Sequence, residues 1–173
     1  MRHILSLCLF CFILSARQAS CIDTTMIGKV APRFTLADVS GKKIALSDYQ
    51  GKVIILNFWS TGCGPCKEEM PSLHNLFLEY EKKGLIVLAV SKDDSETDVR
   101  SFIKKKAITF PALLDKDDEV SFDLYCVGNL PTSFLIDRDG IIIKIIIGGK
   151  VWDDRNMKDD ITSLLSKKRK EAK

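Results

Sequence analysis

The most constraining feature of this chain is an apolar strand that passes directly into a helix. The stretch GKVIILNFWS (51–60) follows a turn glycine and has no polar break from Val53 to Leu56, which predicts a buried β-strand. From Pro65 onward the apolar residues recur with a helical period: Met70, Leu73, Leu76, Phe77 and Tyr80. A strand that feeds straight into a helix is typical of α/β domains, so we expect that class.

The rest of the chain repeats this alternation. We expect a β-hairpin around 34–46, a second buried strand at 85–91 and a helix at 95–107 with Ser95 as its N-cap. The later expected elements are a strand at 110–115, a short helix at 118–125, a hairpin formed by 132–137 and 141–148, and a helix at 152–165. Strands joined through helices should run parallel and hairpin strands antiparallel. The prediction is one α/β domain over 28–166, with helices on both faces of a mixed sheet.

The first 21 residues have the pattern of a secretory signal peptide. Arg2 precedes a continuous apolar run from Ile4 to Leu14, and small and polar residues follow it. The run is short for a membrane span, which needs about 20 residues. An uncleaved membrane anchor and a lipoprotein with a lipid on Cys21 remain alternatives. A linker (22–30) and a basic tail (167–173) would flank the domain.

The charge balance excludes one class of partner. The chain has 26 Lys and Arg against 23 Asp and Glu, a net charge of +3. A nucleic-acid-binding domain would carry a much stronger basic excess, so we expect no nucleic-acid partner.

The pair Cys63 and Cys66 stands where the strand turns into the helix, and three interpretations compete. A structural zinc site commonly needs four ligands, but Cys126 stands alone and His74 is the only histidine after the signal peptide. A purely structural disulfide would close a very short loop and so add little stability. The third interpretation, a redox-active pair, is favoured because the N-terminus of a helix stabilises a thiolate. We therefore expect neither a metal nor a cofactor.

Three stretches together resemble the thioredoxin superfamily, and within it the TlpA/ResA-like exported thiol-disulfide oxidoreductases. They are IGKVAPRFTLADVSGKKIALSDYQGK, VIILNFWSTGCGPCKEEMPSL and YCVGNLPTSFLIDRDG. With the element order, the likeness covers residues 27 to about 166. It implies a thioredoxin-like fold: a central mixed sheet flanked by helices, an N-terminal β-hairpin and a central α/β insertion.

The resemblance also implies roles for individual residues. Cys63 would be the exposed nucleophile and Cys66 the buried resolving thiol. Pro131 would be a cis-proline, which with the preceding Leu130 presents backbone to an extended substrate. Glu69 matches the acid found at this place in ResA-like proteins; because it lies one helical turn after Cys66, we expect it to accept the proton of that thiol, with a surface carboxylate as the alternative.

The sequence departs from the family pattern at several positions. Asn57 replaces the buried aspartate of thioredoxin, so that base is absent. Gly62 stands where the family often has tryptophan. Trp59 is expected to pack beside the active-site helix, on the substrate side of the domain with Leu130 and Pro131. Cys126 matches no catalytic position, and pairing with Cys21 is conceivable.

The expected function is an exported, periplasmic or otherwise extracytoplasmic, protein-disulfide reductase that uses the Cys63–Cys66 couple. By resemblance it could serve cytochrome c maturation. Its partners would be disulfide-containing client proteins and a membrane electron donor, with membrane anchoring through the N-terminus as an option. The alternatives are a general disulfide oxidant or isomerase, and a non-catalytic binding module or metal chaperone on the same fold.

Overall fold

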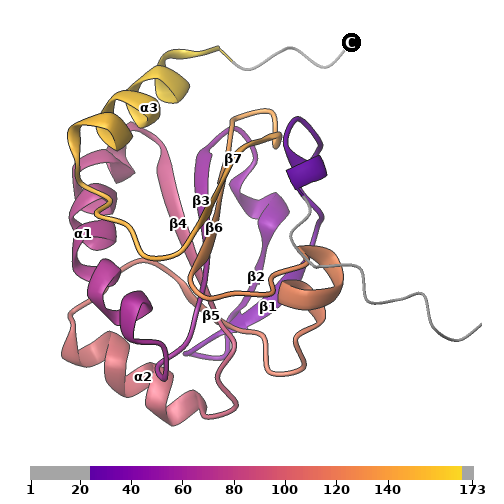
Figure 1. The fold of residues 1–173 in the computed structure, drawn as a ribbon, viewed down its shortest axis with the longest axis vertical. Coiled ribbons are helices and arrows are strands. Elements are labelled where there is room, and N and C mark those ends of the chain that lie inside the picture. Colours follow the sequence, from indigo (N-terminus) through magenta and orange to yellow (C-terminus); the bar gives the residue numbers. More distant parts are fainter. Residues whose placement is uncertain (1–23, 169–173) are drawn as a thin grey trace, which may run out of the picture.

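Seven strands form one mixed β-sheet in the order β2-β1-β5-β4-β3-β6-β7 (Figure 1). The computed structural model describes residues 24–168, so the predicted signal peptide and most of the basic tail lie outside the described residues. The strands are β1 (Thr35–Asp38), β2 (Lys43–Ala45), β3 (Val53–Trp59), β4 (Leu85–Ser91), β5 (Ala112–Leu114), β6 (Thr132–Ile136) and β7 (Ile142–Ile147).

The strand directions follow the connections, as predicted. β3, β4 and β5 are joined through helices and pair in parallel, whereas the hairpins β1–β2 and β6–β7 are antiparallel. β6 also pairs antiparallel with β3, and the register places Thr132 opposite Phe58. The start of β6 therefore lies beside the end of β3, where the chain leaves the sheet toward the two cysteines.

Three α-helices cover one face of the sheet: α1 (Gly64–Tyr80), α2 (Glu96–Lys105) and α3 (Arg155–Ser166) (Figure 1). Helices lie on both faces of the sheet, as predicted, but all three α-helices are on the same face. β3, β4 and β5 follow one another in one direction across the sheet, so the right-handed connections through α1 and α2 lie on the same side. The opposite face is covered by the N-terminal segment and the one-turn helices η2 (Leu46–Tyr49) and η4 (Glu119–Leu124). The sheet is thus flanked by helices, in a thioredoxin-like fold.

The segment between β4 and β6 contains α2, β5 and η4, at the place of the predicted central insertion. The expected short helix is present there as η4, but it is a turn of π-helix, in which the Tyr125 N–H donates to the Val120 carbonyl five residues back. Asp118, at its start, has a left-handed backbone with φ of 56°.

Residues of the predicted linker are attached to the sheet edge. The Gly28 N–H donates to the Ile142 carbonyl (2.8 Å), and the Ile142 N–H donates to the Lys29 carbonyl (2.9 Å). Ile142 begins β7, whereas Ile147 at its other end pairs with Thr132. The N-terminal segment therefore joins the domain at the end of the sheet away from the cysteines.

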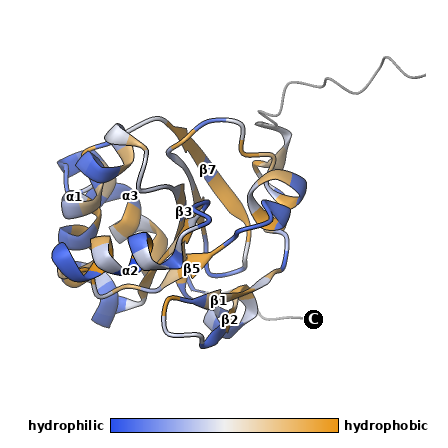
Figure 2. Cartoon of the chain, turned by 90° about the horizontal axis from the view of Figure 1, so that it is seen from below, coloured by the Kyte–Doolittle hydropathy of each residue, from blue (hydrophilic) through white to orange (hydrophobic). Residues whose placement is uncertain are grey.

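The apolar residues gather along the strands and on the inner sides of the helices, while the outer helix surfaces are hydrophilic (Figure 2). Within residues 24–168, no helix combines the length and apolarity needed to cross a membrane.

Candidate active site

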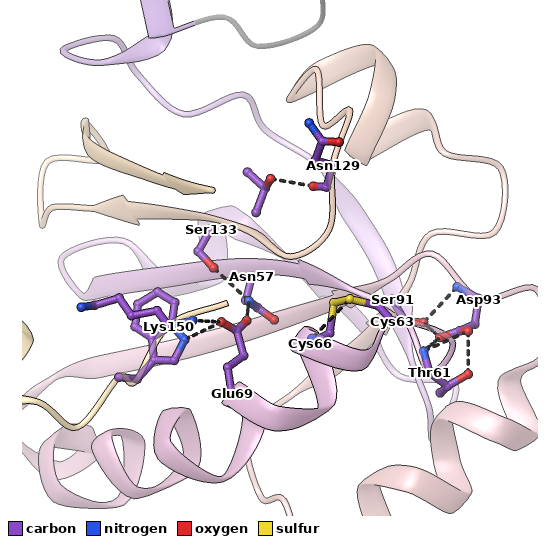
Figure 3. The surroundings of a disulfide bond; sticks show 12 residues. Asn57, Thr61, Cys63, Cys66, Glu69, Ser91, Asp93, Asn129, Ser133 and Lys150 are labelled. Carbon is purple, nitrogen blue, oxygen red and sulfur yellow. Dashed lines mark hydrogen bonds between the residues drawn. A yellow bond between two sulfur atoms is a disulfide. The ribbon is translucent and has the colours of Figure 1, made fainter. Parts of the chain in front are cut away.

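Cys63 and Cys66 form a disulfide at the start of α1, with the sulfur atoms 2.05 Å apart (Figure 3). Cys63 is the N-cap residue of the helix, and its Sγ accepts a hydrogen bond from the Cys66 N–H at 3.2 Å. Pro65 lies in the first turn, where its lack of an N–H costs no helical hydrogen bond. The geometry expected from the strand–helix junction is therefore present.

The two sulfurs have unequal access to solvent. Cys66 is 0% exposed and packs in the core between the sheet and the helices, whereas Cys63 is only partly buried. Cys63 lies at the N-terminal end of α1, where the Cys66 N–H donates to its Sγ and the partial positive charge of the helix end favours a thiolate. Of the two cysteines, only Cys63 has exposed surface.

The turn that leads into Cys63 is fastened to the end of β4 by Asp93. Its carboxylate accepts hydrogen bonds from the Thr61 N–H (2.8 Å) and from the Thr61 hydroxyl (2.7 Å). The Ser91 hydroxyl donates to the same carboxylate at 2.7 Å. These bonds hold the segment between β3 and α1 against the neighbouring strand (Figure 3).

Glu69 lies one helical turn after Cys66 and is only 3% exposed, which excludes the alternative of a surface carboxylate. Its Oε1 accepts from Asn57 Nδ2 at 2.8 Å. Its Oε2 accepts from the Lys150 N–H at 3.0 Å and from Trp152 Nε1 at 3.1 Å. The donors come from the sheet and from the segment after β7, so the tertiary fold encloses this carboxylate.

Burial raises the pKa of the Glu69 carboxyl because it penalises the charged form. The hydrogen bonds from Trp152, Asn57 and Lys150 favour the charged form and offset part of this increase. The carboxyl also borders a groove of about 570 Å³ between α1 and the 149–151 segment, lined by Pro65, Glu68, Glu69, Pro71, Ser72, Asn75, Gly149, Lys150 and Val151. A group that can hold or release a proton thus lies between the helix turn that carries Cys66 and a groove open at the surface.

Asn57 connects the sheet to this carboxylate. It is a fully buried residue of β3, and its Nδ2 also donates to the Ser133 hydroxyl of β6 at 2.8 Å. The position where thioredoxin has an aspartate is therefore occupied by a neutral side chain that binds Glu69.

The remaining predicted site residues lie on neighbouring elements. The Leu130–Pro131 peptide bond is cis, as the resemblance implied, and immediately precedes β6, whose first residue pairs with Phe58. Leu130 is partly exposed. Trp59 is 0% exposed and packs against Phe102, so its ring has no surface to offer a substrate.

Cys126 takes part in a disulfide as well, so it is not a free thiol. Cys21, the partner considered from the sequence, lies outside the described residues.

The family model of the AhpC/TSA family matches residues 27–145 of this chain. A thiol-disulfide oxidoreductase ResA from Bacillus cereus is 46% identical over 126 residues, which cover 73% of this chain and 72% of that protein. The chain belongs to the AhpC/TSA family, as a ResA-like member. The ResA of Bacillus subtilis is 42% identical to this ResA-like chain over 121 residues, 70% of this chain and 67% of that protein.

Solved structures support the ResA-like assignment. The thioredoxin domain of a thiol-disulfide oxidoreductase from Bacteroides vulgatus superposes with a TM-score of 0.71 at 27% identity, covering 81% of this chain and 98% of that one. StoA from Bacillus subtilis gives a TM-score of 0.60 at 30% identity and covers 70% and 91% of the two chains.

The structure adds site residues that the sequence analysis missed. Ser133, Lys150 and Trp152 support Asn57 and Glu69, and Asp93 fixes the turn before Cys63. One signal was available for Asp93: it follows a buried strand parallel to β3, and the carboxyl ends of parallel strands meet at one sheet edge.

Proposed function

We propose that this protein is an exported thiol-disulfide oxidoreductase whose Cys63–Cys66 pair reduces disulfides in client proteins. The observation that carries the proposal is the unequal burial of the bonded pair, with Cys63 partly exposed at a helix N-cap and Cys66 fully enclosed. Such a pair gives one sulfur to the client and keeps the other for resolution.

The reaction runs in two exchanges of sulfur bonds. In the dithiol form, the Cys63 thiolate attacks one sulfur of a client disulfide; a mixed disulfide forms and the client's other sulfur leaves as a thiolate. Cys66 then loses its proton and attacks Cys63 Sγ, which gives the internal disulfide and releases the second client thiolate. Two electrons pass from the cysteine pair to the client, whose two sulfurs end as thiols after protonation.

Glu69 accepts the proton that Cys66 must lose. A buried thiol holds its proton tightly because desolvation disfavours the thiolate. Glu69 is the buried carboxylate one turn away along the same helix, and burial raises its pKa, so it holds a proton more tightly than an exposed glutamate does. The groove beside it offers the proton a route to solvent.

The client would approach over Gly62, Cys63 and the Leu130–Pro131 bond. Gly62 is exposed and has no side chain to cover Cys63, and Leu130 is partly exposed beside the end of β3. An extended client segment at this place could pair with the backbone before Pro131, as the family resemblance implies.

The cellular setting is the finer part of the proposal. The signal-peptide pattern of residues 1–21 supports export, and an exported reductant needs a membrane electron donor to renew its thiols. Cytochrome c maturation is the client pathway that the family resemblance suggests. The Gly-Pro pair between the cysteines favours a reductant over an oxidant, because thioredoxin has the same pair and a potential of about −270 mV.

A trapping experiment tests the function. The Cys66→Ser variant, expressed with its native N-terminus, should accumulate mixed disulfides with clients through Cys63, because the second exchange cannot occur. The matched control is Cys63→Ser, in which the remaining Cys66 is buried and should trap nothing. Mass mapping of the adducts identifies the clients and the compartment.

The direction of net electron flow is tested by measuring the reduction potential of the wild-type Cys63–Cys66 pair in equilibrium with dithiothreitol or glutathione. A potential between roughly −300 and −180 mV fits a reductant or exchanger, whereas a value near −120 mV would indicate an oxidant. Equal trapping by both cysteine variants would overturn the assignment of Cys63 as nucleophile.

A further inference from the structure

Within residues 24–168, the side-chain amide of Asn57 makes hydrogen bonds through Nδ2 but not through Oδ1. Its Nδ2 donates to Glu69 Oε1 and to the Ser133 hydroxyl, both at 2.8 Å. The ionised carboxylate of Glu69 can only accept, so in that state Nδ2 faces it and Oδ1 points the other way. Oδ1 is buried and has no hydrogen-bond partner among the described residues. A buried unpartnered amide oxygen is costly, so it calls for an explanation.

Oδ1 faces the second cysteine. Alternate residues of a strand share a face, and Ile55 and Trp59, on either side of Asn57, pack in the same core cluster as Cys66. Figure 3 shows the Asn57 amide between Glu69 and Cys66 of α1, with its nitrogen toward Glu69 and its oxygen on the side of Cys66. In the disulfide form shown here, Cys66 Sγ carries no proton that it could donate.

We propose that Asn57 is a positioning residue for the redox couple: in the dithiol form its Oδ1 accepts a hydrogen bond from the Cys66 thiol. Reduction of the disulfide breaks the S–S bond and adds two electrons and two protons, one of which forms the Cys66 S–H. The amide oxygen then gains the partner that it lacks in the disulfide form. When Cys66 gives up that proton to close the disulfide, the oxygen loses its partner again.

Two consequences follow from this contact. It stabilises the dithiol form relative to the disulfide, which makes the couple less reducing than the fold would otherwise make it. It also directs the Cys66 S–H toward Asn57. Because the same amide donates to Glu69 through Nδ2, the thiol proton and the Glu69 carboxylate lie on either side of one side chain. The inference rests on the proposed redox function of the cysteine pair.

The first measurement can already be judged in a variant that keeps Asn57, and the leucine variant serves as the comparison. In the Cys63→Ser variant Cys66 remains a thiol, and its S–H stretching band is recorded by infrared difference spectroscopy against Cys63→Ser/Asn57→Leu. A donating thiol absorbs at lower wavenumber than one in an apolar environment. We expect the band to lie low with Asn57 and to move up with leucine. The proposal would be overturned if, with Asn57 present, the S–H band already lay at the wavenumber of a thiol that donates no hydrogen bond. This result can be read even if the leucine variant fails to fold.

The second measurement is the redox equilibrium with dithiothreitol. In Asn57→Leu the equilibrium constant for reduction should fall about tenfold, a shift of about 30 mV to more negative potential. Ser133→Ala is the matched control: it removes the other partner of Nδ2 but leaves Oδ1 in place, and should change the constant less than twofold. An equal shift in both variants would overturn the proposal.

A double-mutant cycle separates Oδ1 from the bond to Glu69. The effect of Asn57→Leu should persist in the Glu69→Gln background; its disappearance there would mean that Asn57 acts only through Glu69. A failure of the proposed redox function would look different from a failure of this inference. In that case the wild-type disulfide itself would show no reversible equilibrium with dithiothreitol.

Discussion

The indole N–H of Trp152 donates to Glu69 Oε2 at 3.1 Å, across 83 positions of sequence. Both residues are buried, and the bond joins the active-site helix to the segment between β7 and α3. It lowers the pKa of Glu69, against the larger effect of burial. The segment after the sheet therefore takes part in setting the proton affinity at the redox site.

Trp152→Phe should raise the pKa of Glu69 further, because a hydrogen bond to the charged form is lost. The rising limb of the pH–rate profile for reduction of a model disulfide should then move to higher pH. Trp59→Phe is the matched control, since Trp59 is equally buried but its Nε1 has no hydrogen-bond partner among the described residues. An equal shift in both variants would contradict the role of the Trp152 bond.

Glu69→Gln should slow turnover about 10²-fold or more, the lower range for loss of a proton-transferring group. The disulfide should still form, and the pH dependence between about 5 and 8 should flatten. The pH–rate profiles of the wild type and the variant test this, with Glu68→Gln as the exposed control on the same helix. Overlapping curves would show that the proton of Cys66 goes directly to water.

The raised pKa of Glu69 also predicts a pH-dependent stability. The folded state holds this proton more tightly than the unfolded state, where the pKa is about 4.3. The contribution to the free energy of unfolding is complete below the unfolded pKa and is lost as pH rises through the folded pKa. Denaturant titrations of the oxidised proteins should therefore show the wild type losing stability relative to Glu69→Gln as the pH rises above about 4. A constant difference would contradict the shift.

Cys63 should react with iodoacetamide much faster than Cys66 in the reduced protein at neutral pH. Exposure and the helix N-terminus both favour attack through Cys63, whereas Cys66 is enclosed. Timed alkylation followed by peptide mapping measures the two rates. Similar rates would mean that the roles of the two cysteines are assigned wrongly.

Asp93→Ala should destabilise the oxidised protein by about 1–3 kcal/mol, because the Thr61 N–H and hydroxyl lose their acceptor. Asp94→Ala, at an exposed neighbouring position, should change the free energy of unfolding by less than about 0.5 kcal/mol. Thermal or denaturant unfolding checks both values, and a comparable loss in Asp94→Ala would rule out the specific contact.

The strands, the helix start and the cysteine pair could be predicted because their signals are local. Val53 to Leu56 form an unbroken apolar run, and Pro65 begins a clear helical period. The burial of Glu69 could not be read in this way. It stands in the hydrophilic run Lys67-Glu68-Glu69, and only the return of residues 149–152 onto α1 encloses it.

The same limit applies to the covering of the sheet. Each helix was predicted from its own period, but its side of the sheet depends on the strand order, which no local pattern encodes. The role of Asn57 likewise depends on Ser133, which lies 76 residues away and was predicted only as part of a strand.

The backbone bonds of Gly28 and Lys29 to Ile142 fix the N-terminal segment to the end of the sheet opposite the redox pair. The chain enters the domain at one end of β7, and Cys63 lies beyond the other end of the sheet, past the pairing of Ile147 with Thr132 and of Thr132 with Phe58. An anchor on the N-terminal side would therefore be joined to the domain at the end opposite Cys63. Client proteins in solution could then reach Cys63 without meeting the anchor. An electron donor in the membrane would need a domain that extends as far as the end of this protein that carries Cys63.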